Sequence, residues 1–132
     1  MNAQVAEIDI SSGDLEVVKI WCAYDCGFAL DPSNVVHQME SGITYALSAT
    51  MFGEITVKNG VVEQSNFHDY DVMRLANMPE VEVALLESKE IVGGAGEAAV
   101  PATAPAVANA IFAATGQRLR RLPLPTSGYG IA

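Results

Sequence analysis

Three glycines stand within four positions of the chain, at Gly93, Gly94 and Gly96, between a strand-like run and an alanine-rich helical run that ends near Thr115. Such a cluster lets the backbone adopt φ > 0 or approach a ligand closely. Glu97 follows directly and places one carboxylate on this hinge, just before a helix. We therefore take Glu97 as the first candidate catalytic residue. The alternative is an ordinary strand-to-helix turn, in which Glu97 stabilises the helix dipole by about 0.3 to 1 kcal/mol.

The beginning of the chain predicts a strand, a turn and a second strand. Apolar and acidic residues alternate over Val5–Ile10, a turn cluster covers Ser11–Asp14, and an apolar run covers Leu15–Cys26. Two strands joined by so short a turn are expected to pair antiparallel. Val81–Leu86 predicts a further strand.

Two helices are predicted. Asp31 supplies an N-cap and Pro32 a first-turn proline, and apolar residues then recur at helical spacing until Gly53. The apolar positions are Val35, Val36, Met39, Ile43, Leu47 and Met51. After the glycine hinge, Pro105–Ala114 predicts a second helix, rich in small residues and stopped by Gly116.

Asn59-Gly60 is the strongest short signal for a hairpin, so the chain is expected to fold back between Glu54 and Gln64. These elements together indicate the α+β class, a mainly antiparallel sheet packed with two main helices. At 132 residues and 50% hydrophobic, the chain is expected to form one modest core. We assign residues 1–124 to this domain and residues 125–132 to a C-terminal tail.

Charge and hydropathy exclude several functional classes. A net charge of −9 argues against binding to nucleic acid or to an anionic membrane. The one basic cluster, Arg118–Arg121, is short and fits a helix C-terminal cap or a subunit contact. No apolar run reaches the roughly 18 residues of a membrane span, and Met1–Gln4 leads into no signal-peptide core. We expect a soluble, untargeted chain, either cytoplasmic or periplasmic.

No metal site is predicted. Cys22 and Cys26 are the only cysteines, too few for an iron-sulfur cluster, and on an extended segment they would lie about 13 Å apart. His37 and His68 lack the spacing of zinc ligands. We expect the two cysteines to be buried structural thiols.

Other residues that resemble site residues have structural interpretations. His68 stands beside Asp69, as in a catalytic pair, but neighbours on a strand point to opposite faces. We therefore expect no direct pairing and a supporting or packing role. Trp21 and Tyr24 lie in an apolar strand and are expected in the core.

Three ordered segments stand out: Asp25-Cys26-Gly27 with Asp31-Pro32 and Val36–Gly42; Gly53–Thr56 with Ser65–Tyr70; and Gly94–Glu97 with Ala104–Gly116 and Leu122–Leu124. They resemble the C-terminal end of the large, molybdopterin-binding subunit of the xanthine dehydrogenase and aldehyde oxidase family, of the isoquinoline 1-oxidoreductase beta type. Each is weak alone, but together they are specific. The resemblance covers roughly residues 5 to 124.

The resemblance implies roles for particular residues. Glu97 matches the glutamate of the family's Gly-x-Gly-Glu motif, the base beside the molybdenum, and Gly94 and Gly96 would let the backbone approach the cofactor. Gln38 matches the glutamine of a Gln-x-Glu-Gly-Gly stretch that contacts molybdopterin; without the resemblance it is equally a surface or capping amide. Ser41 stands where the family has glycine, which puts the packing around Gln38 in question.

The resemblance also implies what this chain would need from others. The family's large subunit is several times longer, so we expect either a truncated or engineered segment or one chain of a split subunit. Its partners would be the remainder of the large subunit and an iron-sulfur electron-transfer subunit. Alone, the chain is expected to bind no molybdopterin, to be inactive and to form a homo-oligomer. The chain would thus be a catalytic segment of a molybdenum hydroxylase that oxidises an N-heterocycle or aldehyde with water-derived oxygen; the alternative is a non-catalytic binding or assembly domain.

Overall fold

The computed structural model describes residues 1–88, 90–128 and 130–131. Its first two elements form an antiparallel hairpin of β1 (Asn2–Asp9) and β2 (Asp14–Asp25). Gly13 adopts φ 94° in the connecting turn, where its N–H donates to the Ile10 carbonyl over 3.1 Å. The predicted strand, turn and antiparallel strand are confirmed.

The first predicted helix is confirmed as α1 (Pro32–Phe52). Asp31 caps it: the Asp31 carboxylate accepts from the Asn34 N–H over 3.1 Å, and Pro32 occupies the first turn, where its missing N–H costs nothing. The helix ends at Gly53, whose N–H donates to the Ala49 carbonyl. Its buried positions recur at helical spacing: Met39, Gly42, Ile43, Ala46, Leu47, Thr50 and Met51.

The main sheet has the order β1-β2-β5. β5 (Glu80–Leu86) pairs parallel to β2, which requires a crossover connection, and α1 forms part of that crossover. At the other end of β2, β6 (Gly130–Ile131) adds a short parallel pair. The α+β class with two main helices is confirmed, and the structure adds the parallel orientation of β5.

The second helix is longer than predicted. α2 (Val100–Thr115) begins at Val100, so Pro105 lies inside it instead of at its start. Pro105 is still close to the beginning of the helix, and the bond it removes would have ended on the carbonyl of Pro101, one turn earlier. The predicted end is confirmed, because Gly116 adopts φ 74° and its N–H donates to the Phe112 carbonyl over 2.8 Å.

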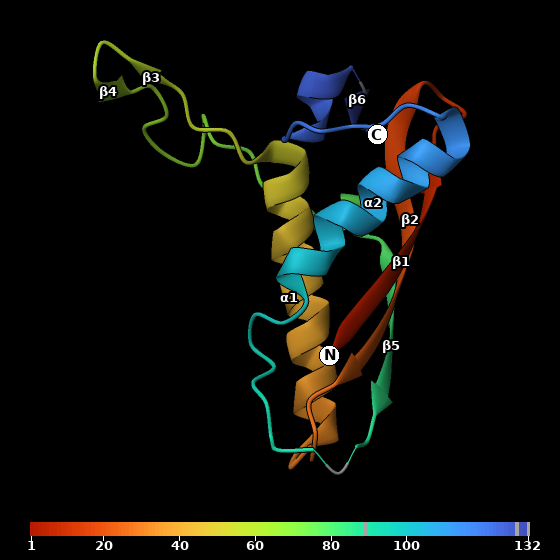
Figure 1. Ribbon diagram of the computed structural model, residues 1–132. Helices are drawn as coiled ribbons and strands as arrows, with labels where there is room; N and C mark the ends of the chain where they lie inside the picture. Colours follow the sequence, from red (N-terminus) through yellow and green to blue (C-terminus); the bar gives the residue numbers. More distant parts are fainter. Residues whose placement is uncertain (89, 129, 132) are drawn as a thin grey trace.

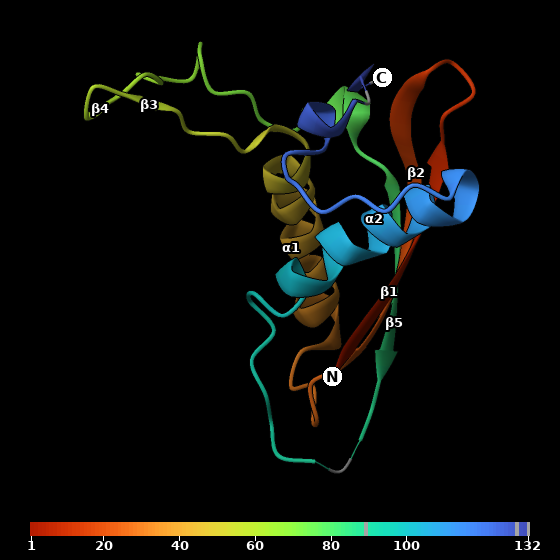
Figure 2. The same cartoon turned by 45° about the horizontal axis from the view of Figure 1, so that its top comes forward.

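Both long helices cover one face of the main sheet, and α2 crosses α1 on its way to β1 (Figures 1 and 2). Beyond α1 the chain forms an arm that projects away from the sheet (Figure 1). The arm contains the predicted hairpin of β3 (Val57–Lys58) and β4 (Val61–Val62), with Asn59 and Gly60 at φ 52° and 79°. Two short 3-10 helices complete the fold, η1 (Leu75–Asn77) and η2 (Leu124–Ser127).

The core lies between the sheet and the two helices. Its fully buried apolar side chains include Leu15, Ile20, Met39, Ile43, Leu47, Val107, Ile111 and Leu124, from β2, α1, α2 and η2. In the described part of the chain, no helix combines the length and the apolarity that crossing a membrane requires.

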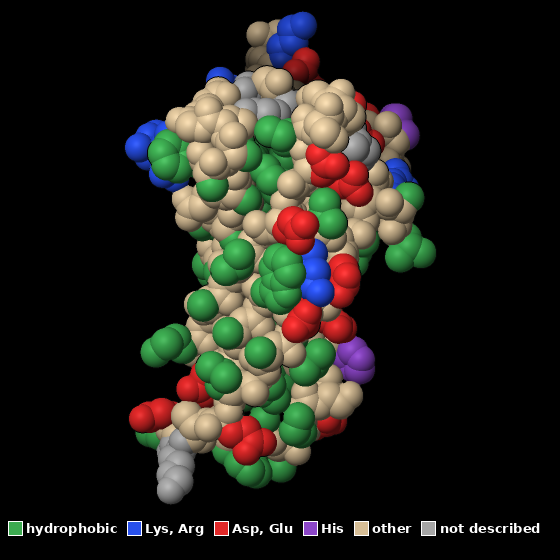
Figure 3. Space-filling model, turned by 90° about the vertical axis from the view of Figure 1, so that its right-hand side faces the viewer, with side chains coloured by type: hydrophobic (Ala, Val, Ile, Leu, Met, Phe, Trp, Pro, Cys, Tyr) green, Lys and Arg blue, Asp and Glu red, His purple; other side chains and the backbone are tan. Residues whose placement is uncertain are grey.

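The prediction that Trp21 belongs to the core is wrong. Ile20 and Cys22 face the helices, so Trp21 between them points to the opposite, uncovered face of the sheet and is 38% exposed. There it lies beside Lys19, whose ammonium group is 5.0 Å from the indole ring centroid. Figure 3 shows hydrophobic side chains on this side of the molecule next to a short row of acidic and basic ones.

The predicted separation of His68 and Asp69 is also wrong. The segment is a turn and not a strand, so the His68 Nε2 atom lies 3.7 Å from an Asp69 carboxylate oxygen. The carboxylate mainly organises the loop, because it accepts from the backbone N–H groups of Asn66 and Ser65 and from the Ser65 hydroxyl. These bonds lower the pKa of Asp69, and His68 remains exposed to solvent.

We expect Asp31→Ala to lower the free energy of unfolding by about 0.5 to 2 kcal/mol, because the Asn34 N–H loses its capping acceptor. Urea denaturation of the chain measures this change. Asp31→Asn keeps a capping oxygen and serves as the control with nearly unchanged stability. Equal stability of all three proteins would show that the cap contributes nothing.

Candidate functional site

The glycine-rich segment connects the end of β5 to the beginning of α2 and runs beside α1 (Figure 1). The Gly93 N–H donates to the Cys26 carbonyl over 2.7 Å, which holds the first glycine of the segment against the loop after β2. None of the three glycines has positive φ, so the first of the two alternatives, a left-handed backbone, does not apply to them. A Cβ atom added at Gly94 or Gly96 would meet nothing within 4 Å. No contact within the chain therefore requires glycine at these two positions. The close approach of another group would require it.

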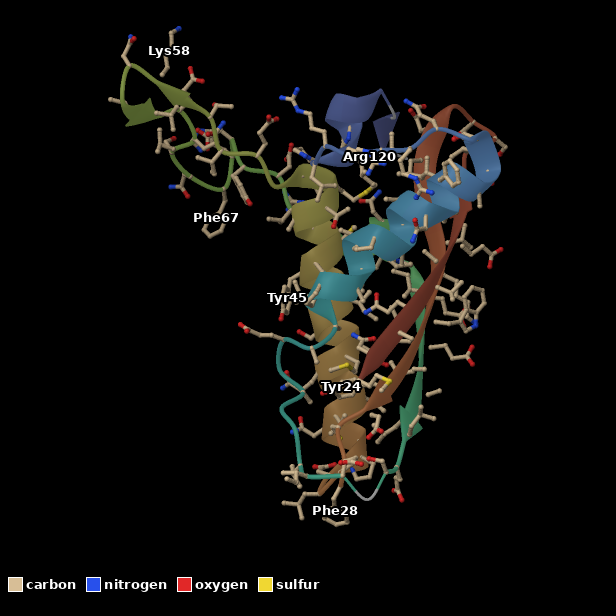
Figure 4. All side chains as sticks on the ribbon, in the orientation of Figure 1. Tyr24, Phe28, Tyr45, Lys58, Phe67 and Arg120 are labelled. Atoms are coloured by element: carbon tan, nitrogen blue, oxygen red, sulfur yellow. The ribbon has the colours of Figure 1, made fainter. Side chains whose placement is uncertain are left out.

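Two tyrosines hold the middle of this segment. The Tyr24 hydroxyl, from β2, donates to the Gly94 carbonyl, and the Tyr45 hydroxyl, from α1, donates to the Gly96 carbonyl over 3.1 Å (Figure 4). Tyr24 is buried in the core, as predicted, and burial raises the pKa of its hydroxyl, which keeps the proton that the bond requires. Tyr45 is 44% exposed.

Two side-chain amides of β1 hold the end of the segment. Asn2 Nδ2 donates to the Ala98 carbonyl over 2.6 Å, and Gln4 Nε2 donates to the Ala99 carbonyl over 2.8 Å. Each amide oxygen also has a donor, which fixes the orientation of the group. The Cys22 thiol lies 3.4 Å from Asn2 Oδ1, and the Thr103 hydroxyl lies 2.9 Å from Gln4 Oε1.

The cysteines are free and buried, as predicted. Burial raises the pKa of the Cys22 thiol, which therefore stays protonated as a donor to Asn2. Within the described residues, no group of three or more His, Cys, Asp or Glu side chains could hold a metal ion.

Glu97 is exposed and lies in the bend directly before α2. Its own carbonyl accepts from the Val100 N–H over 3.1 Å, so the residue belongs to the turn that starts the helix. Four side chains from β1, β2 and α1 thus donate to backbone carbonyls between Gly94 and Ala99, on both sides of Glu97. The carboxylate is presented to solvent on a backbone that three elements hold in place.

Gln38 is also exposed, on α1. It precedes Tyr45 by seven residues, which places both on the same face of the helix, about 10 Å apart along its axis. Because the Tyr45 hydroxyl bonds to the Gly96 carbonyl, Gln38 lies on the side of α1 that the segment carrying Glu97 contacts.

Ser41, which stands where the family has glycine, is exposed and therefore does not disturb the packing of α1 in this chain. Its neighbour Gly42 makes the close contact: a Cβ atom added at Gly42 would lie 2.9 Å from the Ala99 Cβ atom. The missing side chain at Gly42 allows α1 to approach the beginning of α2.

Sequence reasoning missed Asn2, Gln4 and Tyr45. Asn2 and Gln4 occupy the strand positions that point towards the helices, in phase with Ala6 and Ile8. Polar residues at inward positions of a strand need partners, and this signal could have identified them. Tyr45 stands on the solvent face of α1, where the sequence carries no comparable signal.

Residues 1–79 match the family model of a molybdopterin cofactor-binding domain. Isoquinoline 1-oxidoreductase subunit beta of Brevundimonas diminuta is 38% identical over 124 residues, which is 92% of this chain. The membrane-bound aldehyde dehydrogenase (pyrroloquinoline-quinone) of Gluconacetobacter polyoxogenes is 34% identical over 122 residues. The chain therefore belongs to the molybdopterin-binding subunits of the xanthine dehydrogenase and aldehyde oxidase family, as the resemblance implied.

The fold agrees with this assignment. Quinoline 2-oxidoreductase from Pseudomonas putida 86 superposes with a TM-score of 0.78 over 90% of this chain, at 24% sequence identity. The chain spans 16% of the length of that structure, and likewise 16% of each of the two curated relatives. The similarity therefore covers most of this chain but only a small part of each relative.

We expect Gly42→Ala to lower the free energy of unfolding by about 1 kcal/mol. Overpacking against Ala99 costs about 1 to 3 kcal/mol, and the better helix propensity of alanine offsets up to about 1 kcal/mol. Adding Ala99→Gly removes the clashing methyl group, so the double variant should recover part of the loss. Urea denaturation of the variants measures both effects, with Ser41→Ala as the control on the exposed face of α1. The contact is contradicted if Gly42→Ala stabilises the protein and the added Ala99→Gly change does not alter its effect.

Proposed function

We propose that this chain is a catalytic segment of a molybdenum hydroxylase that oxidises an N-heterocycle or an aldehyde with oxygen derived from water. The observation that carries the proposal is the exposed Glu97 carboxylate on a backbone held by four side-chain donors, on the side of α1 that also presents Gln38. The names of the matched relatives supply the two substrate classes, isoquinoline or quinoline and aldehyde.

The residues present fit molybdopterin. The exposed amide of Gln38 offers donors and an acceptor, which suits the mixed donor and acceptor edge of a pterin. Gly94 and Gly96 leave open space where side chains would stand, so a flat group can approach their backbone. Gln38, Gly94 and Gly96 would thus bind the cofactor, which when bound supplies the redox centre that accepts two electrons from the substrate.

Glu97 would act as the general base. A hydroxyl group derived from water attacks the electrophilic carbon of the substrate better as it loses its proton. The Glu97 carboxylate would accept that proton at a carboxylate oxygen, and such positioned base catalysis contributes about 10²- to 10⁴-fold. The hydrogen bonds on both sides of Glu97 would keep the carboxylate in place during proton transfer.

The activity would require other parts. The chain spans 16% of its matched relatives, so the remainder of a large subunit would complete the cofactor and substrate pocket, and an iron-sulfur subunit would remove the electrons. Alone, the chain would be inactive. Exposed apolar side chains, among them Val5, Val57 and Phe67, would favour self-association of the isolated chain.

In a complete enzyme that contains this chain, we expect Glu97→Gln to lower turnover by at least about 10²-fold, because the amide keeps the volume of the side chain but cannot accept the proton. Steady-state kinetics and molybdenum content measure the effect, and the molybdenum content should stay unchanged. Glu90→Gln, an exposed carboxylate earlier in the same connection, is the matched control. Turnover of the Glu97 variant at the wild-type rate would favour a non-catalytic binding or assembly domain instead.

We expect Gln38→Ala to reduce the molybdopterin retained by that enzyme, because each lost hydrogen bond contributes about 0.5 to 1.5 kcal/mol. Quantifying molybdenum and released pterin after purification tests this expectation. His37→Ala, a neighbouring exposed residue of α1, should retain the full content. Equal cofactor content and equal rate in both variants would make Gln38 an ordinary helix residue.

A further inference from the structure

We propose that Tyr45 is a positioning residue for Glu97, an inference that rests on the proposed catalytic function of that carboxylate. The Tyr45 hydroxyl donates to the Gly96 carbonyl over 3.1 Å. That carbonyl belongs to the peptide group joining Gly96 to Glu97. Because a peptide group is planar, a hydrogen bond to its oxygen restrains the rotation of the whole group that directly precedes the Glu97 Cα atom.

The backbone needs this restraint at this point. Glycine has more accessible backbone conformations than any other residue, and no packing compensates at Gly96, where an added Cβ atom would meet nothing within 4 Å. After Glu97, the bonds from Asn2 to Ala98 and from Gln4 to Ala99 hold the chain. The Tyr45 bond provides the corresponding restraint on the other side.

Tyr45 differs from the other three donors in its surroundings. Tyr24 is buried, and Asn2 and Gln4 are half-buried in networks with Cys22 and Thr103, so their loss would also disturb the core. Tyr45 and Gly96 are both exposed, and water can replace the lost donor to the Gly96 carbonyl. Tyr45→Phe should therefore leave the fold stable while the peptide before Glu97 becomes free to move. α1 gives the hydroxyl a rigid base, because the neighbouring Ala46 and Leu47 are buried.

The first test measures motion without requiring activity. In ¹⁵N relaxation of the 132-residue chain, the Glu97 amide should have an order parameter near that of rigid backbone, about 0.85, and Tyr45→Phe should lower it towards about 0.6. Thr44→Val is the matched control, since the Thr44 hydroxyl donates to Glu40 within the same helix. An unchanged order parameter at Glu97 in Tyr45→Phe overturns the proposal.

The second test uses the complete molybdenum enzyme. Tyr45→Phe should lower kcat about tenfold with KM and molybdenum content unchanged, because misplacing a catalytic group slows the chemical step without weakening binding. The kcat–pH profile should be lowered without moving along the pH axis. Wild-type kcat in Tyr45→Phe, or a loss of molybdenum that accounts for the lower rate, overturns the positioning role. If Glu97→Gln itself keeps full turnover, the proposed function fails, whereas a normal Tyr45→Phe enzyme beside an impaired Glu97→Gln enzyme refutes this inference alone.

Discussion

The close contact between Gly42 of α1 and Ala99 at the start of α2 determines how the rest of the structure is arranged. A methyl group at Gly42 would come within 2.9 Å of the Ala99 Cβ atom, so only the absence of a side chain allows the two helices to meet there. Because α2 begins at this contact, the glycine-rich segment before it must run beside α1 to reach it. The position of Glu97 is therefore a consequence of helix packing as well as of the local motif.

Hydrogen bonds then convert an irregular connection into a defined one. In this segment, side chains of β1, β2 and α1 donate to the carbonyls of Gly94, Gly96, Ala98 and Ala99. A typical bond of this kind contributes only about 0.5 to 1.5 kcal/mol, but a carbonyl buried without a donor would cost more. The same bonds that satisfy the backbone also restrict its motion, which suits a segment that would present a catalytic base.

Sequence reasoning worked best where one or two residues control the structure locally. The Asp31 cap, the Asn59-Gly60 turn and the Gly116 helix end depend on side-chain or backbone properties within a few residues, and all three are present. It failed at Trp21. The helices cover only one face of the sheet, and the register of β2 places Trp21 on the other face. It also failed at His68 and Asp69, because a turn brings together neighbours that a strand would separate.

The sequence by itself determined the α+β class, the limits of most elements, the family and the candidate roles of Gln38 and Glu97, since these depend on periodicity, local turn chemistry and ordered motifs. Only the tertiary structure decided that β5 runs parallel to β2 and that the segment of Glu97 contacts α1 on the side that also carries Gln38. It alone decided that Asn2 and Tyr45 hold this segment, because their partners are 96 and 51 residues away. Contacts between such distant residues follow from the packing of whole elements, and local patterns carry little information about them.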